Sequence, residues 1–268
     1  MNFVRMNDGA RIAYDISGHG PTLVFSHCLG GNRAVWAPLI ARLDDRFRCI
    51  TYDLRGQGDS ETTPGPYTMA QLAVDALELL DALAVERGVF AGVSMGGMVA
   101  QHLALLAPSR VSGLILADTA PGFDGAGRAA WDERIEQLQR GGIAPLVDPM
   151  MARWFSEAFR RCQPAVVAEM AATLARADLN GYIASCAAVR DHDLRWRLKD
   201  ISAPTLVLCG EHDPSTPLPL SQALAAGIPG ARLAVLAGLN HLPNVEAPEV
   251  FSGVVDNFLQ TLHLFSRR

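Results

Sequence analysis

Short apolar runs alternate with longer segments of helical periodicity along most of the chain. The runs read as buried strands at residues 22–26, 48–52, 89–91, 111–117, 205–209 and 233–236. Between two of them, apolar residues recur at helical spacing from Leu72 to Leu83, as in an amphipathic helix. Strands that are apolar on both faces and alternate with helices predict a mostly parallel sheet, covered by helices on both faces.

Three further elements complete this pattern. Residues 3–6 and 11–17 read as a hairpin around Asn7-Asp8-Gly9. Residues 36–43 suit a helix, and a stripe of apolar residues from Val250 to Leu262 predicts the last helix.

The alternation is interrupted between about Pro121 and Arg195, where no strand pattern occurs. Helical stretches at residues 131–138, 166–174 and 182–189 are separated there by glycine, proline and asparagine breakers. We therefore expect a helical cap at residues 121–195, inserted into an α/β core formed by residues 1–120 and 196–268.

Composition and charge narrow the functional classes. The net charge is -5, with no basic stripe, which argues against a nucleic-acid surface. No apolar run is long enough to span a bilayer and no signal-peptide core is apparent, so we expect a cytoplasmic protein. The five cysteines are scattered without metal-ligand spacing, so no disulfide framework and no metal site is predicted. No pattern predicts an oligomeric state.

The candidate chemistry centres on Gly92-Val93-Ser94-Met95-Gly96. A strand candidate precedes this G-x-S-x-G pattern and a long apolar helix candidate follows it, which is the context of a nucleophile elbow. In such a turn the serine hydroxyl is presented above the sheet edge, near the positive end of the helix. Ser94 is therefore the predicted nucleophile.

A serine nucleophile needs a base, and the base needs an orienting acid. In this architecture the order along the chain is serine, acid and histidine, with the last two in loops after late strands. Asp213 and His241 occupy such loops, and Asp118, which follows the strand at 111–117, is the rival acid. Among seven histidines, His241 alone occupies the loop that the mechanism needs, whereas His27 is expected to tie down local backbone.

The developing oxyanion requires two backbone donors. One is expected to be the amide of Met95, directly after the nucleophile, and the other the amide of Leu29, in the loop after the strand at 22–26.

The chain resembles an α/β-hydrolase, and more narrowly the 3-oxoadipate enol-lactonase group. Matching stretches run nearly end to end, at residues 52–56, 65–68, 131–135, 153–155, 186–191, 210–213 and 241–246. Two stretches depart from the group's pattern: His27-Cys28-Leu29-Gly30 replaces an Asn-Ser-Leu-Gly loop, and Gly56-Gln57-Gly58 replaces Gly-His-Gly. Cys28 lacks an elbow, so it is not the expected nucleophile.

The resemblance implies a small acidic substrate whose carboxylate would need a cationic anchor. Arg134 and Arg153 are the candidates, beside the cap aromatics Trp131 and Trp154, which are expected to form cap core or pocket wall. The alternative for both arginines is a solvated position on the cap surface.

These features predict a cofactor-free serine hydrolase that cleaves an ester or lactone through an acyl-enzyme. The alternatives are a general carboxylesterase, a carbon–carbon bond hydrolase or perhydrolase with the same triad, and a ligand receptor on a hydrolase fold. Epoxide hydrolase and dehalogenase chemistry is disfavoured, because it requires a carboxylate at the position of Ser94.

Overall fold

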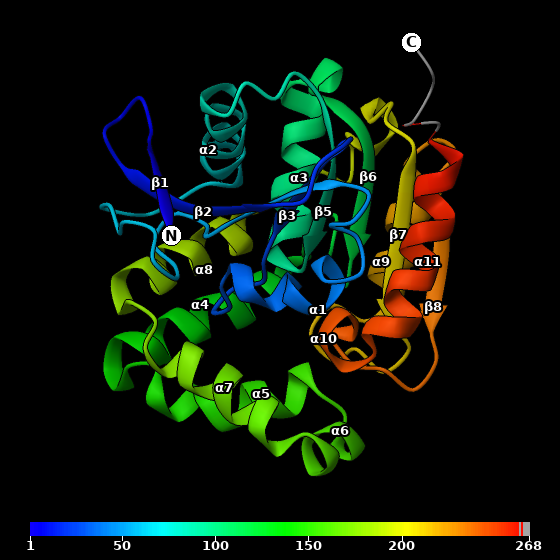
Figure 1. Cartoon of the computed structure of the whole chain (residues 1–268). Coiled ribbons are helices and arrows are strands. Elements are labelled where there is room, and N and C mark those ends of the chain that lie inside the picture. The colour runs from blue at the N-terminus through cyan, green and yellow to red at the C-terminus, as the bar shows by residue number, and fades with distance from the viewer. Residues whose placement is uncertain (263, 265–268) are drawn as a thin grey trace.

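The computed structural model describes residues 1–262 and 264, and its centre is one eight-stranded sheet in the order β1-β2-β4-β3-β5-β6-β7-β8 (Figure 1). The strands are β1 Asn2–Arg5, β2 Arg11–Ser17, β3 Thr22–Ser26, β4 Arg48–Tyr52, β5 Gly88–Val93, β6 Val111–Ala117, β7 Thr205–Gly210 and β8 Arg232–Leu236. The six strands from β3 to β8 pair in parallel, and β1 and β2 form the antiparallel edge. The predicted mostly parallel sheet and the predicted hairpin are both confirmed.

Parallel pairing requires a crossover between consecutive strands, and helices supply it. The core helices are α1 Ala37–Ile40, α2 Met69–Ala82, α3 Met95–Leu106, α9 Leu218–Gly227, α10 Pro243–Glu246 and α11 Pro248–Thr261, with short 3-10 turns η1 Arg33–Trp36, η2 Pro108–Arg110 and η4 Leu198–Asp200. Helix α2 begins where the Thr68 hydroxyl accepts a hydrogen bond from the amide of Gln71 at 3.1 Å. Helix α3 packs on β3, β5 and β6, which holds the end of β5 at the middle of the sheet.

Five helices lie between β6 and β7 in the chain and gather at one end of the sheet (Figure 1). They are α4 Gly125–Gly141, α5 Val147–Trp154, α6 Glu157–Cys162, α7 Pro164–Ala175 and α8 Leu179–Asp191, with η3 Ala144–Leu146 between the first two. Asp124 and Asp178 cap α4 and α8 through their side chains. A bridge between Gly122 and Asp193 brings the two ends of this segment together.

Three details differ from the prediction. Residues 36–43 form only the short α1, because η1 starts earlier at an Asn32 side-chain cap and the chain after Ile40 tightens into i→i+3 bonds such as Leu43 N to Ile40 O. Helices α5 and α6 were not predicted. Strand β8 is not buried on both faces. Because it is the last strand of the sheet, its apolar residues Leu233 and Val235 are exposed.

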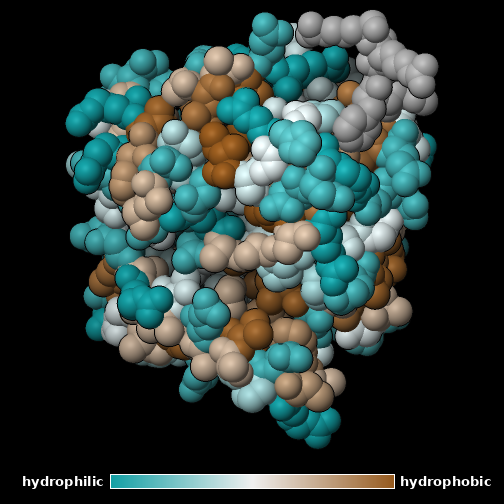
Figure 2. All heavy atoms as spheres, viewed as in Figure 1, coloured by the Kyte–Doolittle hydropathy of each residue, from teal (hydrophilic) through white to brown (hydrophobic). Residues whose placement is uncertain are grey.

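On the face shown in Figure 2, hydrophilic side chains cover most of the surface and hydrophobic ones are interspersed in small groups. Among the described aromatic side chains, that of Trp196 is the most exposed, at 70%. Within the described residues, no helix combines the length and the apolar character that a membrane crossing requires.

Candidate active site

Ser94 lies in a strained turn between β5 and α3. Its φ of 56° is in the region that side-chain-bearing residues rarely adopt, and its carbonyl accepts a 2.6 Å hydrogen bond from Thr119 Oγ1. The turn is closely packed, because a Cβ atom on Gly96 would lie 2.1 Å from the carbonyl oxygen of Ser26. Such strain is held only where the surrounding structure over-determines it, which is the geometry of a nucleophile elbow.

Asp213 and His241 are brought together by the neighbouring strands β7 and β8, whose carboxyl ends open at the same edge of the sheet. Asp213 Oδ2 lies 2.8 Å from His241 Nδ1. The carboxylate also accepts hydrogen bonds from Ser215 N at 2.7 Å and from Thr216 Oγ1 at 2.6 Å. An ionised Asp213 requires Nδ1 to be the donor, so in the neutral imidazole Nε2 is left as the acceptor of a proton.

Opposing effects act on the ionisation of Asp213. Burial alone would raise the pKa of this carboxyl, but the charge of His241 and the hydrogen bonds from His241, Thr216 and Ser215 outweigh it and lower the pKa to about 2. The acid beside His241 is therefore ionised at neutral pH.

Asp118 lies next to this pair but is bound differently. It follows β6 with a φ of 44°, and its Oδ1 accepts the amide of Gly210 at 2.7 Å, while its buried Oδ2 has no hydrogen-bond partner among the described residues. Burial, together with the charge of Asp213, raises the pKa of Asp118 well above its usual range. The hydrogen-bonded partner of His241 is thus Asp213, whereas the hydrogen bond of Asp118 goes to the amide of Gly210.

The amides of Leu29 and Met95 have no acceptor within the described part of the chain, although both residues are buried. Backbone donors in buried residues are almost always paired. Two unpaired amides, one directly after Ser94 and one in the loop after β3, are therefore available to an oxyanion.

One cavity of about 270 Å³ joins these groups to the segment between β6 and β7. Ser94, His241 and Leu29 line it from the sheet side, and the side of the α4–α8 segment contributes Phe123, Trp131, Arg134, Met150, Arg153, Trp154 and Val189. Ser94 Oγ forms no hydrogen bond within the described residues. In hydrolases, the hydrogen bond between a nucleophile and its base often forms only when substrate binds.

Arg134 and Arg153 differ in what they contact. The Arg134 guanidinium lies 5.0 Å from the Trp131 ring centroid and 3.6 Å from Met150 Sδ, and it forms no salt bridge within the described chain. Arg153 donates to the carbonyl of Pro214 at 3.2 Å. Trp154 is 1% exposed, so it is a wall of the cavity and part of the helical core.

His27 ties down local backbone. Its Nε2 accepts the amide of Leu54 at 2.9 Å, so its Nδ1 is the donor toward the carbonyl of Cys28 at 2.7 Å. Burial lowers the pKa of His27 and raises that of the Cys28 thiol to about 12, which leaves the imidazole neutral and the thiol unreactive.

The other histidines lie elsewhere. His102 Nε2 and His192 Nδ1 are 3.2 Å apart, and His192 Nε2 lies 3.0 Å from the carbonyl of Ala120. His19 and His212 are exposed, and His263 is outside the described residues.

Among the described side chains, one group has the spacing of metal ligands: Asp118, Asp213 and His241, whose ligand atoms lie within 4.8 Å of one another. The hydrogen bond between Asp213 and His241 accounts for much of that proximity.

The α/β-hydrolase fold family model matches residues 21–248. The chain belongs to this family, and it is a hydrolase. A 3-oxoadipate enol-lactonase of Acinetobacter baylyi is 37% identical, over 88% of this chain and 87% of the relative. The crystal structure of the enol-lactonase from Burkholderia xenovorans superposes with a TM-score of 0.93 at 33% identity, covering 97% of this chain and 100% of that one.

A second solved structure, of a hydrolase from Pseudomonas aeruginosa, is 40% identical with a TM-score of 0.91, and covers 96% of this chain and 97% of that one. The resemblance to the α/β-hydrolases and to the enol-lactonases is therefore confirmed.

Proposed function

We propose that the hydrolase cleaves a small carboxylic ester or lactone through an acyl-enzyme. The observation that carries the proposal is the Asp213–His241 hydrogen bond of 2.8 Å, together with a cavity that both His241 and the strained Ser94 line. Similarity to proteins named enol-lactonases supports the same chemistry.

In the proposed reaction, Ser94 Oγ attacks the acyl carbon while His241 Nε2 takes the hydroxyl proton. The negative charge that develops on the acyl oxygen is stabilised by the amides of Leu29 and Met95. His241 then protonates the leaving alkoxide or enolate, and activates the water that releases the acid from Ser94. Asp213 holds the imidazole in its tautomer and stabilises the imidazolium.

We also propose that the α4–α8 segment, residues 121–195, serves as the cap that selects the substrate. Arg134 supports a substrate with a distal carboxylate, because its guanidinium lines the cavity without a carboxylate partner in the described chain. Arg153 is the second candidate anchor. An anionic end bound there would leave the acyl group near Ser94, which uses remote binding energy to orient the reaction.

The test is hydrolysis of a panel that contains 3-oxoadipate enol-lactone, neutral lactones, and matched acidic and neutral short-chain esters. We expect turnover without added metal or cofactor, with the highest kcat/KM for the compounds that carry a distal carboxylate. A preference for neutral esters would make the protein a general carboxylesterase. The absence of any ester or lactone turnover would contradict the proposed function.

A further inference from the structure

Gln57 is buried between two parts of the protein whose relative position matters for the proposed reaction. It belongs to the loop after β4, and its side chain is reached from one side by residues 27–31, here called the oxyanion loop, and from the other by helix α8. The residue itself is 3% exposed.

Both ends of the Gln57 amide are engaged. Its Oε1 accepts the amide N–H of Gly30 at 2.7 Å, and its Nε2 donates to Ser185 Oγ on α8 at 3.1 Å. Because the backbone N–H of Gly30 can only donate, the amide orientation is determined by its partners.

These contacts bear directly on the orientation of the Leu29 amide. The N–H of Leu29 and the carbonyl of Cys28 belong to one peptide plane, and His27 holds that carbonyl at 2.7 Å. The N–H of Gly30 and the carbonyl of Leu29 belong to the next plane, which Gln57 holds. Both planes that flank Leu29 are therefore fixed by side chains.

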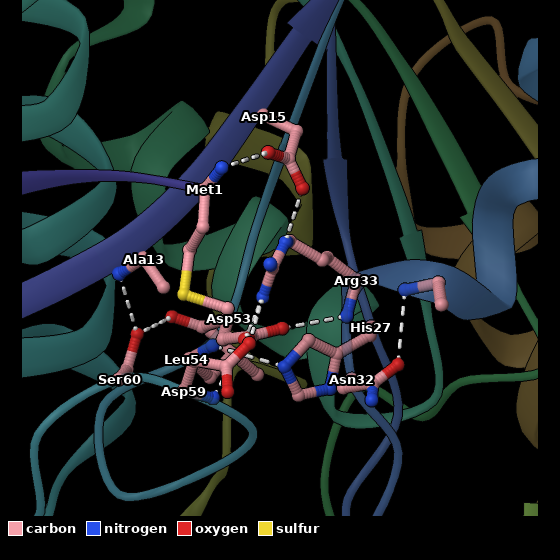
Figure 3. A network of polar contacts seen from close by, with 11 residues as sticks. Met1, Ala13, Asp15, His27, Asn32, Arg33, Asp53, Leu54, Asp59 and Ser60 are labelled. Carbon is pink, nitrogen blue, oxygen red and sulfur yellow. Dashed lines mark hydrogen bonds and ion pairs between the residues drawn. The ribbon is translucent and has the colours of Figure 1, made fainter.

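The loop after β4, which carries Gln57, is itself held in place by several contacts. Figure 3 shows the His27 ring facing Leu54 and the Arg33 guanidinium between Asp15 and Asp53. These contacts hold the loop after β4 against the oxyanion loop.

The cap helices α7 and α8 pack on the oxyanion loop. A Cβ atom on Gly30 would lie 2.6 Å from Leu174 Cδ1 of α7 and 2.9 Å from Tyr182 Cε2 of α8. A shift of α8 would therefore act on the oxyanion loop both by contact and through the Gln57–Ser185 hydrogen bond.

We propose that Gln57 is a positioning residue that couples the cap to the oxyanion hole, by holding the Leu29–Gly30 peptide while it is bound to Ser185 on α8. The inference rests on the proposed function, since it assigns Leu29 to oxyanion binding. It also gives a role to one position at which the chain departs from the enol-lactonase pattern.

Gln57→Met tests the coupling, because methionine keeps a similar length but offers neither amide group. Losing an oxyanion donor outright costs about 10²–10³ in rate. Displacing one should cost less, so we expect kcat to fall by about tenfold, with KM changed by less than about twofold. Affinity for benzeneboronic acid, whose tetrahedral serine adduct places an oxygen in the oxyanion hole, should fall by a similar factor.

The matched control is Gln101→Met. Gln101 is also buried, at 0% exposure, and its Nε2 donates to the carbonyl of Ala120 at 3.0 Å, away from the oxyanion loop. We expect this variant to lose stability but to keep the wild-type kcat and boronate affinity. A purely structural role for Gln57 would make the two variants behave alike.

Ser185→Ala completes a double-mutant cycle. If the amide transmits the position of α8, this change lowers kcat in the wild type but has no further effect on Gln57→Met. Wild-type boronate affinity in Gln57→Met, or a full additional loss from Ser185→Ala, would overturn the coupling. If the wild type neither hydrolyses esters nor binds the boronate, the proposed function fails instead.

Discussion

His241 Nδ1 and Asp213 Oδ2 lie 2.8 Å apart, and the two side chains are 3% and 0% exposed. A hydrogen bond between an ionised acid and an imidazole is strengthened by such burial, because little water competes for either partner. The pair comes from loops after β7 and β8, and it opens toward the cavity that Ser94 lines.

Ser94→Ala should abolish ester hydrolysis and leave the fold intact, since it removes one oxygen from a turn that the glycines shape. We expect the residual kcat to be below about a hundredth of the wild type. Activity on an aryl ester and the thermal midpoint should be measured together. Ser252→Ala on α11 is the control, as among the described residues its hydroxyl hydrogen-bonds to the carbonyl of Glu249 alone. Substantial turnover by Ser94→Ala would remove the serine from the mechanism.

Asp213→Asn should lower kcat by about 10⁴, because asparagine no longer holds His241 in the required tautomer. Asp118→Asn is the matched control, since the amide has a similar shape and the carboxyl it replaces is bound to the amide of Gly210 rather than to His241. We expect it to change kcat far less. Steady-state rates of both variants decide between the two acids, and the reverse order of effects would assign the role to Asp118.

Arg134→Ala should lower kcat/KM for an acidic ester and leave the matched neutral ester nearly unchanged, because only the acidic substrate loses an ion pair. Arg153→Ala is measured in parallel, as the second possible anchor. Arg140→Ala is the control on the same helix, with a side chain 72% exposed and paired with Glu136. Equal small changes on both substrates would leave Arg134 and Arg153 as cap surface residues.

His102→Gln should make the folded protein less sensitive to acid. Burial lowers the pKa of His102 to about 4 and that of His192 to about 3, below the value of about 6.5 in an unfolded chain. The unfolded state therefore binds protons first, so stability present above pH 6.5 is lost as the pH falls toward 4.

The free energy of unfolding falls between pH 7 and pH 4.5, and in His102→Gln this fall should be smaller than in the wild type by about 2 kcal/mol. Denaturant titrations at the two pH values measure this. Equal drops in the wild type and the variant would show that His102 does not contribute to the acid sensitivity.

Much of the fold was determined by local sequence patterns. Apolar runs such as 22–26 and 111–117 became β3 and β6 with the predicted bounds, because strands buried on both faces need continuous apolar side chains. The strand, Gly-x-Ser-x-Gly and helix context also predicted the tight turn at Ser94 between β5 and α3, since such a turn depends on residues adjacent in sequence.

Only the tertiary structure decided how distant residues pair. Asp118 and Asp213 both follow strands whose ends meet, so the sequence left two acids, and the direction of each side chain selected the partner of His241. The bridge from Gly30 through Gln57 to Ser185 joins three segments far apart in the chain, and no local pattern reports such a contact. The exposed face of β8 follows from its place at the edge of the sheet, which depends on the whole strand order. Periodicity records which residues are buried, whereas hydrogen-bond partners are fixed only when the packed backbone sets distance and direction.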